Sequence, residues 1–216
     1  MMAEPDVALT DYALVLESFL FSAWIYRLRP ANSLRPWFVL MFGSIGLAAL
    51  VGGTVHGFLT DPHSRLTRIC WLITMIILGM TALSEYGLAA RILFPPRSAS
   101  VVTPAAFLMF AAYTAIVVAW SDTFRIAVVN YMIGLLFLAA GFLRLYAGNR
   151  SRAALIGLAG LLLTVGASVV QQARISIHPH YFNHNALYHL LEAVALFLIY
   201  ISARSLVCTT MQLENR

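Results

Sequence analysis

Polar residues gather at the start of one long apolar stretch, FNHNALYHLLEAVALFLIYISAR, at positions 182–204. Asn185, His189 and Glu192 are spaced i, i+4, i+7, so a helix places all three on one stripe of its surface. Neutral imidazole is the commonest metal ligand in proteins, and a carboxylate is a good companion to it. His184 is rotated by more than a quarter turn from His189, so it either lines the rim of the same site or faces water.

A second histidine, His56, stands near the end of an apolar stretch that we place at 37–60. It shares a helical stripe with Gly46, Ala49 and Gly53, and small residues let helices approach one another closely. His56 is therefore expected on the packed side of its helix. An ionisable side chain in such a place is costly unless it has a partner, which makes His56 a candidate functional residue.

Four further polar residues stand at a comparable depth when each stretch is laid out at about 1.5 Å per helical residue. They are Asp11, Glu17, Gln171 and Gln172. Together with the histidines they predict one polar pocket near one end of a helical bundle. Structural alternatives exist: Asp11 is also suited to cap the first helix, and the glutamines to bond neighbouring helices. For Glu85 we expect an ion pair with a nearby arginine.

The composition indicates that these residues belong to membrane-spanning helices. The chain has 216 residues, 61% of them hydrophobic and 11% charged, whereas a soluble domain is about half apolar and about a quarter charged. We find seven apolar stretches of about 20 residues, the length that crosses a bilayer. They are residues 9–28, 37–60, 69–94, 103–120, 124–147, 152–174 and 185–207.

In lipid these stretches must be helices, because every backbone polar group needs an internal partner. We therefore expect an all-α fold: a polytopic membrane protein with a seven-transmembrane helix bundle, forming a single domain over residues 1–216. The sequence contains no lysine. A rhodopsin is thereby excluded, since retinal is attached through a lysine Schiff base.

The arginines predict an orientation for this bundle. Ten of them follow the first, third, fifth and seventh stretches, and four lie on the opposite side. By the positive-inside rule the N-terminus is outside and the C-terminus is cytoplasmic. The N-terminal stretch has no basic region before it, so we read it as a retained first span. We expect an integral, multi-pass protein of the plasma or inner membrane.

Histidines and carboxylates from different helices could hold a metal ion. Zinc bound by His56, His189 and one further ligand, His184 or Glu192, would keep an open position for water. Zinc converts such a water into a hydroxide nucleophile near neutral pH. Glu17 or Glu192 would then act as a catalytic base or orient a ligating histidine. The remaining polar residues would line the substrate pocket: Asn185, Asp11, Gln171 and Gln172.

These features together resemble the CREST superfamily, which contains the alkaline ceramidases and the adiponectin and progestin receptors. The resemblance covers seven helices, an outside N-terminus, a histidine near the end of the second helix, and NALYHLLEAVALFLIY opening the seventh. NALYH is similar to the HALWH of that group, which carries an HxxxH motif. The resemblance implies zinc bound between helices by His56 and His189, and hydrolysis of an amide or ester bond in a lipid.

Three positions depart from the pattern of that superfamily. Asn185 replaces the first histidine of HxxxH, Gly52 stands where a serine is usual, and no aspartate opens the third helix. Either His184 or Glu192 takes the vacant ligand position, or the metal site has been abandoned.

Three functions are compatible with these patterns. The first is an integral-membrane, zinc-dependent lipid hydrolase with its pocket between the first, second, sixth and seventh helices. The second is a non-enzymatic sensor, carrier or assembly subunit that binds a small molecule or lipid in the same pocket, where carboxylates and histidines also suit proton relay. The third is a scaffold whose polar groups only join helices. We expect a membrane lipid or lipid-like small molecule as partner, and no nucleic acid.

Overall fold

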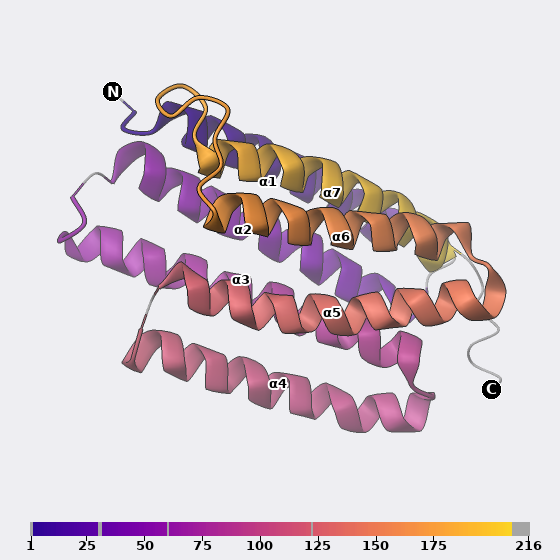
Figure 1. Cartoon of the computed structure of the whole chain (residues 1–216). Coiled ribbons are helices and arrows are strands. Elements are labelled where there is room, and N and C mark those ends of the chain that lie inside the picture. The colour runs from indigo at the N-terminus through magenta and orange to yellow at the C-terminus, as the bar shows by residue number, and fades with distance from the viewer. Residues whose placement is uncertain (1, 30–31, 60, 122, 209–216) are drawn as a thin grey trace.

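The computed structural model describes residues 2–29, 32–59, 61–121 and 123–208. Within them the chain forms seven helices: α1 (Pro5–Arg27), α2 (Arg35–Phe58), α3 (Arg65–Leu93), α4 (Pro96–Ala119), α5 (Phe124–Asn149), α6 (Arg152–Gln172) and α7 (His184–Cys208). Successive helices run antiparallel through short connections (Figure 1). The all-α, seven-helix prediction is confirmed. The predicted end of the second helix at residue 60, and residues 1 and 216 of the predicted domain, lie outside the described residues.

Three helices begin at least four residues earlier than the apolar stretches that predicted them. α1 begins at Pro5 instead of residue 9, α4 at Pro96 instead of residue 103, and α3 at Arg65 instead of residue 69. Proline is well suited to the first helical position, because the N–H it lacks would have no partner there. Ser64 caps α3 by accepting a hydrogen bond from the Thr67 N–H at 3.1 Å. These first turns are more polar than the spans, so a search for apolar runs starts the helices late.

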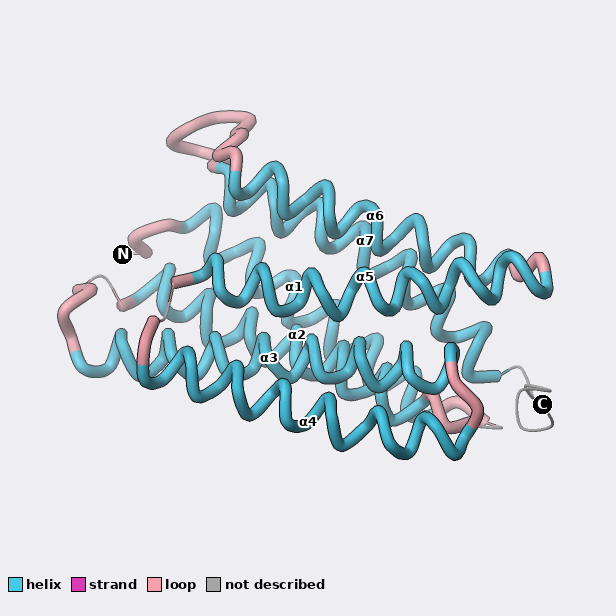
Figure 2. The backbone as a smooth tube through the Cα atoms, turned by 60° about the horizontal axis from the view of Figure 1, so that its bottom comes forward, coloured by secondary structure: helices cyan, strands magenta, loops and turns pink. Residues whose placement is uncertain are grey.

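Six helices form a closed ring in the order α1, α2, α3, α5, α6 and α7, with each helix packed against its two neighbours. The first and last helices of the chain are therefore adjacent. α4 lies outside this ring and packs against α3, at one edge of the bundle (Figures 1 and 2).

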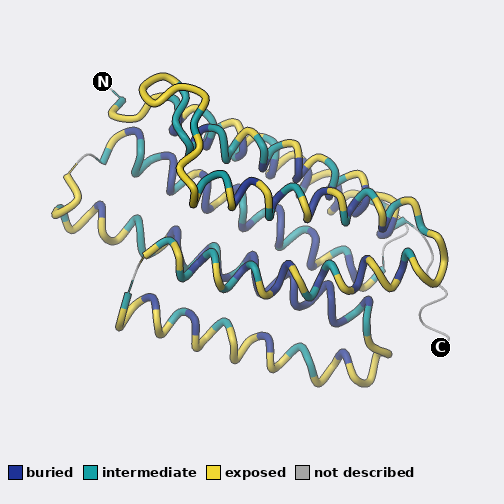
Figure 3. Tube along the Cα trace, viewed as in Figure 1, coloured by how far each residue is buried: buried dark blue, intermediate teal, exposed yellow. Residues whose placement is uncertain are grey.

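Large apolar side chains cover much of the outside of the bundle, where exposed positions follow the outer faces of the helices (Figure 3). On α4, Val101 and Leu108 are each 72% exposed, and Leu16 on α1 is 65% exposed. Water-soluble monomers rarely expose large continuous apolar areas. Each of the seven helices in the described parts of the chain is long and apolar enough to cross a membrane.

Candidate functional site

A cavity of about 200 Å³ lies inside the ring of helices. All six ring helices contribute to its wall, and no described residue of α4 does. The apolar part of the wall consists of leucine, isoleucine, methionine, alanine, glycine and aromatic residues. The polar residues of the wall are Asp11, His56, Thr74, Thr81, Glu85, Tyr131, Thr164, Gln171, Asn185, Tyr188, His189 and Glu192.

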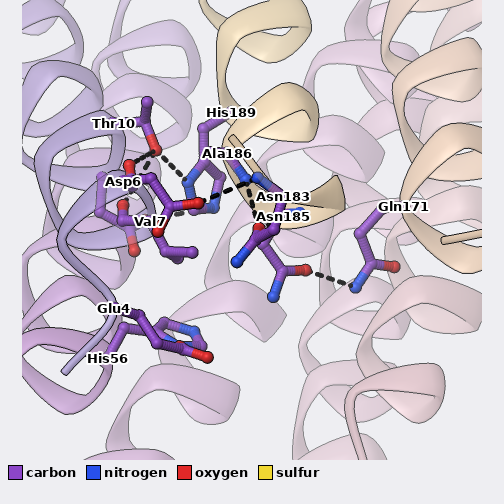
Figure 4. A network of polar contacts seen from close by, with 11 residues as sticks. Glu4, Asp6, Val7, Thr10, His56, Gln171, Asn183, Asn185, Ala186 and His189 are labelled. Atoms are coloured by element: carbon purple, nitrogen blue, oxygen red, sulfur yellow. Dashed lines mark hydrogen bonds and ion pairs between the residues drawn. The ribbon is translucent and has the colours of Figure 1, made fainter. Parts of the chain in front are cut away.

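His189 joins α7 to α1 through both of its ring nitrogens. Its Nδ1 lies 3.0 Å from Thr10 Oγ1 (Figure 4), and its Nε2 lies 3.3 Å from Asp11 Oδ1. Asp11 is buried in the second turn of α1, six residues after Pro5, so the alternative that it caps the helix is wrong. It is accommodated there by Gly53 of α2, since a Cβ at Gly53 would lie only 2.7 Å from the Asp11 Cβ.

His56 lines the same cavity but bonds in another direction. Its Nδ1 lies 2.6 Å from Glu4 Oε2 (Figure 4). The backbone of the same amino-terminal segment is bound to α2 as well: the Glu4 N–H donates to the His56 carbonyl at 3.3 Å, and the Ala3 N–H to the Gly57 carbonyl at 3.0 Å. The amino-terminal segment is therefore hydrogen-bonded to the last turn of α2.

Asn185 and Gln171 link α7 to α6 in the cavity wall. The Gln171 Nε2 donates to Asn185 Oδ1 at 3.2 Å (Figure 4). Asn183 caps the start of α7, because its Oδ1 accepts from the backbone N–H groups of Asn185 at 2.9 Å and Ala186 at 3.1 Å. Gln172 donates to the Gln171 side chain, but it is exposed and does not line the cavity.

Two other predicted site residues do not line the cavity. His184 is the first residue of α7 and Glu17 lies on α1, and both are partly exposed. The fold thus brings His56, His189 and Glu192 to one cavity and leaves His184 and Glu17 outside its wall.

Two glutamates line the cavity from α7 and α3. Glu192 is 8% exposed, and its Oε1 accepts a hydrogen bond from Thr164 Oγ1 at 3.3 Å. Glu85 is 5% exposed and packs against α5, where a Cβ at Gly134 would lie 2.5 Å from Glu85 Oε2. In the described structure Glu192 Oε2, Glu85 Oε2 and Asp11 Oδ2 are all buried without a hydrogen-bond partner. Three carboxyl groups with an unused oxygen therefore belong to the wall of one cavity.

Sequence reasoning missed the place of Glu85 and of Tyr131. Glu85 was expected to pair with an arginine, but its carboxyl group belongs to the cavity wall, and the described residues form no such ion pair. Tyr131 bonds across from α5 to α6, with its hydroxyl 2.7 Å from Ser168 Oγ. A signal for Glu85 was present, because it is the only acidic residue of its apolar stretch. Such a residue marks a functional site more often than a structural one.

The residues as placed do not fit the predicted zinc ion. A zinc site needs three or four ligand atoms about 2.0–2.3 Å from a common point. Both ring nitrogens of His189 already have partners, and His56 Nδ1 is bonded to Glu4. No group of three histidine, cysteine or acidic side chains is placed to hold a metal within residues 2–29, 32–59, 61–121 and 123–208. The zinc site stays a prediction, and no chemical step is derived from it.

The structure is a bundle of seven apolar helices. Three acidic side chains line the cavity inside its ring of six helices. The chain matches a family of unknown function (DUF6962) over residues 7–207 and belongs to that family. The match includes every residue of the cavity wall. No curated protein matches the sequence.

Proposed function

We propose that this chain is a multi-pass membrane protein that crosses the bilayer seven times as one domain, with its N-terminus outside. The length and apolar character of the seven helices support this, as do the apolar side chains exposed around the bundle. In lipid those side chains lie in an apolar medium, so their exposure costs nothing. The excess of arginine at the end of the bundle where α1 and α3 end and α2 and α4 begin supports the orientation.

We propose further that the cavity binds a small molecule, or the polar part of a lipid, without a metal. The observation that carries this proposal is the set of unused carboxyl oxygens on Asp11, Glu85 and Glu192. Buried polar groups in native proteins almost always have a hydrogen-bond partner, and each exception calls for an explanation such as a functional role. Burial of a polar group without a partner also costs about 1–3 kcal/mol. A ligand in the cavity would supply the missing donors.

The size of the cavity limits what it holds. An apolar cavity of about 150 Å³ accepts benzene, whereas the pockets for drug-sized ligands begin at about 300 Å³. A cavity of about 200 Å³ therefore suits a molecule with one ring, or one polar head group, and not a whole lipid. This function corresponds to the non-enzymatic sensor, carrier or assembly subunit considered from the sequence. The zinc-dependent hydrolase and the CREST resemblance remain untested predictions.

The test measures ligand binding to variants whose larger side chains fill the cavity. Benzyl alcohol, a neutral molecule with one ring, is dialysed to equilibrium against the purified protein and against Ala49→Phe, whose side chain replaces a cavity-lining methyl group. We expect Ala49→Phe to weaken binding by at least about tenfold, a change of about 1.4 kcal/mol. Ala159→Phe, at an exposed position on α6, is the matched control and keeps wild-type binding.

Gly52→Leu is a second filling variant in case Ala49→Phe does not fold. A Cβ at Gly52 meets only Thr74 Cγ2, at an ordinary 3.6 Å. Binding that survives both filling variants would show that the cavity is not the site. The same preparations are analysed for metal: stoichiometric zinc in the wild type that is absent from His189→Ala would overturn the metal-free site in favour of the hydrolase.

A further inference from the structure

The cavity wall carries an excess of acidic groups. Asp11, Glu85 and Glu192 line it and are 4%, 5% and 8% exposed. The basic side chains of the described wall are His56 and His189, and no arginine is among them. Each of these histidines is already bonded to an acidic residue: His56 to Glu4, outside the cavity wall, and His189 to Asp11. Glu85 and Glu192 are left without a basic partner in the wall.

The unused atoms of these residues accept hydrogen bonds and do not donate them while the carboxyl groups are ionised. Among the described residues, Thr164 donates one hydrogen bond to Glu192 Oε1, and none donates to Glu192 Oε2 or Glu85 Oε2. A ligand that matches them must bring donors. An ammonium group brings three N–H donors and a positive charge, and hydrogen bonds between charged groups are about twice as strong as neutral ones.

The remainder of the wall specifies the other end of the ligand. Leu78, Leu135 and Leu161 offer an apolar surface, and Trp71 and Phe124 add two aromatic rings whose centroids are 6.3 Å apart. Aromatic faces also attract cations. A carboxylate ligand would be repelled by the acidic groups, and a fully apolar ligand would leave their oxygens without partners.

We infer that the cavity takes an organic ammonium compound with a compact apolar body, whose nitrogen binds Glu85 and Glu192. This inference rests on the proposed function, since it names the ligand class of the same cavity. The ammonium group has two sources in this setting: a free primary amine, or the head group of an aminophospholipid.

Three molecules of nearly equal shape test the charge: benzylamine, benzyl alcohol and benzoate, each dialysed to equilibrium against the purified protein at neutral pH. We expect benzylamine to bind at least about tenfold more tightly than benzyl alcohol, since a hydrogen bond to a charged group contributes more than a neutral one. Benzoate is expected to bind most weakly. Equal binding of benzylamine and benzyl alcohol overturns the inference and leaves the proposed function standing, whereas failure of all three to bind overturns both.

Two glutamine variants test which residues bind the ammonium nitrogen of benzylamine. Glu85→Gln and Glu192→Gln keep the shape of the side chain and remove its charge. Each should weaken benzylamine binding about tenfold and benzyl alcohol binding by less, because the glutamine oxygen still accepts a neutral hydrogen bond. Asp61→Asn removes an exposed carboxylate outside the cavity and is the matched control. Benzylamine binding that is indifferent to both glutamine variants overturns the assignment even when the amine binds.

The source of the ammonium group is distinguished by the lipid around the protein. Benzylamine affinity is compared in nanodiscs of phosphatidylglycerol alone and in nanodiscs that also contain phosphatidylethanolamine. Weaker benzylamine binding in the second preparation assigns the site to the lipid head group, because the lipid competes for it. Equal affinity in both assigns it to a free amine.

Discussion

His189 has a contact at each ring nitrogen: a hydrogen bond with Thr10 at Nδ1, and Asp11 at ion-pair distance from Nε2. The Thr10 hydroxyl has one hydrogen, which it donates to the carbonyls of Asp6 and Val7, both at 2.9 Å. Its oxygen therefore accepts from His189 Nδ1–H at 3.0 Å. The His189 Nε2 lies 3.3 Å from Asp11 Oδ1, so these two side chains are also in contact. Removal of either side chain leaves the other without its partner in a largely apolar wall.

Replacing Thr10 tests this chain of contacts. We expect Thr10→Val to lower the free energy of unfolding by about 0.5–1.5 kcal/mol, because it removes the acceptor of the Nδ1–H group. Thr10→Ser keeps the hydroxyl and should stay close to the wild type. Unfolding of the purified protein in mild detergent measures both, and a double-mutant cycle with His189→Ala measures the coupling. A cycle with no coupling energy would contradict the contact.

At the residue scale the sequence predicted several of the polar residues that line the cavity, and it did not predict their partners. His56, His189, Glu192 and Asn185 were selected because polar groups are costly in apolar helices, and all four line the cavity. The partners could not be predicted, because hydrogen bonds between distant helices depend on helix rotation. Nothing in the sequence indicates that His56 bonds to Glu4.

Among the elements, α1 and α2 approach closely because Gly53 faces Asp11. Helices in apolar surroundings gain little from hydrophobic association and depend on close packing, so a small residue at the contact matters. The same glycine decides where the Asp11 carboxyl group can lie, and through it the position of His189.

The contribution of Gly53 is tested with a matched pair of glycine variants. Gly53→Ala places a Cβ 2.7 Å from the Asp11 Cβ, so α1 must shift, and we expect a loss of about 1–3 kcal/mol in stability. Gly166→Ala on α6 has nothing within 4 Å, and should be neutral or up to about 1 kcal/mol more stable, because alanine favours helix. Thermal unfolding in detergent measures both. Equal melting temperatures for the two variants would contradict the close contact.

Element number and type were predicted from hydrophobic length, and so were the starts of α5 and α6, whereas α1, α3 and α4 begin at least four residues before their predicted starts. The early starts of α1 and α4 rest on Pro5 and Pro96, which are read as breakers when they stand beside an apolar run. The placement of α4 outside the ring was also beyond prediction. Its apolar stretch resembles the others, and only the contacts of the folded chain separate it from them.

For the whole molecule the main expectation is its orientation in a membrane. In a variant whose Cys70 and Cys208 are replaced by alanine, single cysteines are introduced at His63, in the α2–α3 connection, or at Ser98, in the first turn of α4. Both positions are exposed. We expect a membrane-impermeant maleimide to label His63→Cys on intact cells, and Ser98→Cys only after permeabilisation. The opposite pattern would reverse the orientation, and labelling of both on intact cells would contradict the seven-span arrangement.

For the whole molecule, polar residues from distant parts of the chain could be grouped from sequence by their depth alone. Depth along each helix follows from counting residues, so groups at one level were identified. Which helices are neighbours does not follow from counting. The contribution of α3 and α5 to the wall, with Glu85 and Tyr131, became evident only from the closed ring.

The amino-terminal segment is hydrogen-bonded across the end of the bundle at which α2 ends and α7 begins. Ala3 and Glu4 donate to the last carbonyls of α2, and Asp6 Oδ2 accepts from the Asn183 N–H at 2.9 Å. These hydrogen bonds join the amino-terminal segment to both α2 and the start of α7. A fluorescent protein or purification tag joined directly ahead of Ala3 would crowd these contacts, so a fusion at the opposite end of the chain is the safer way to label the protein.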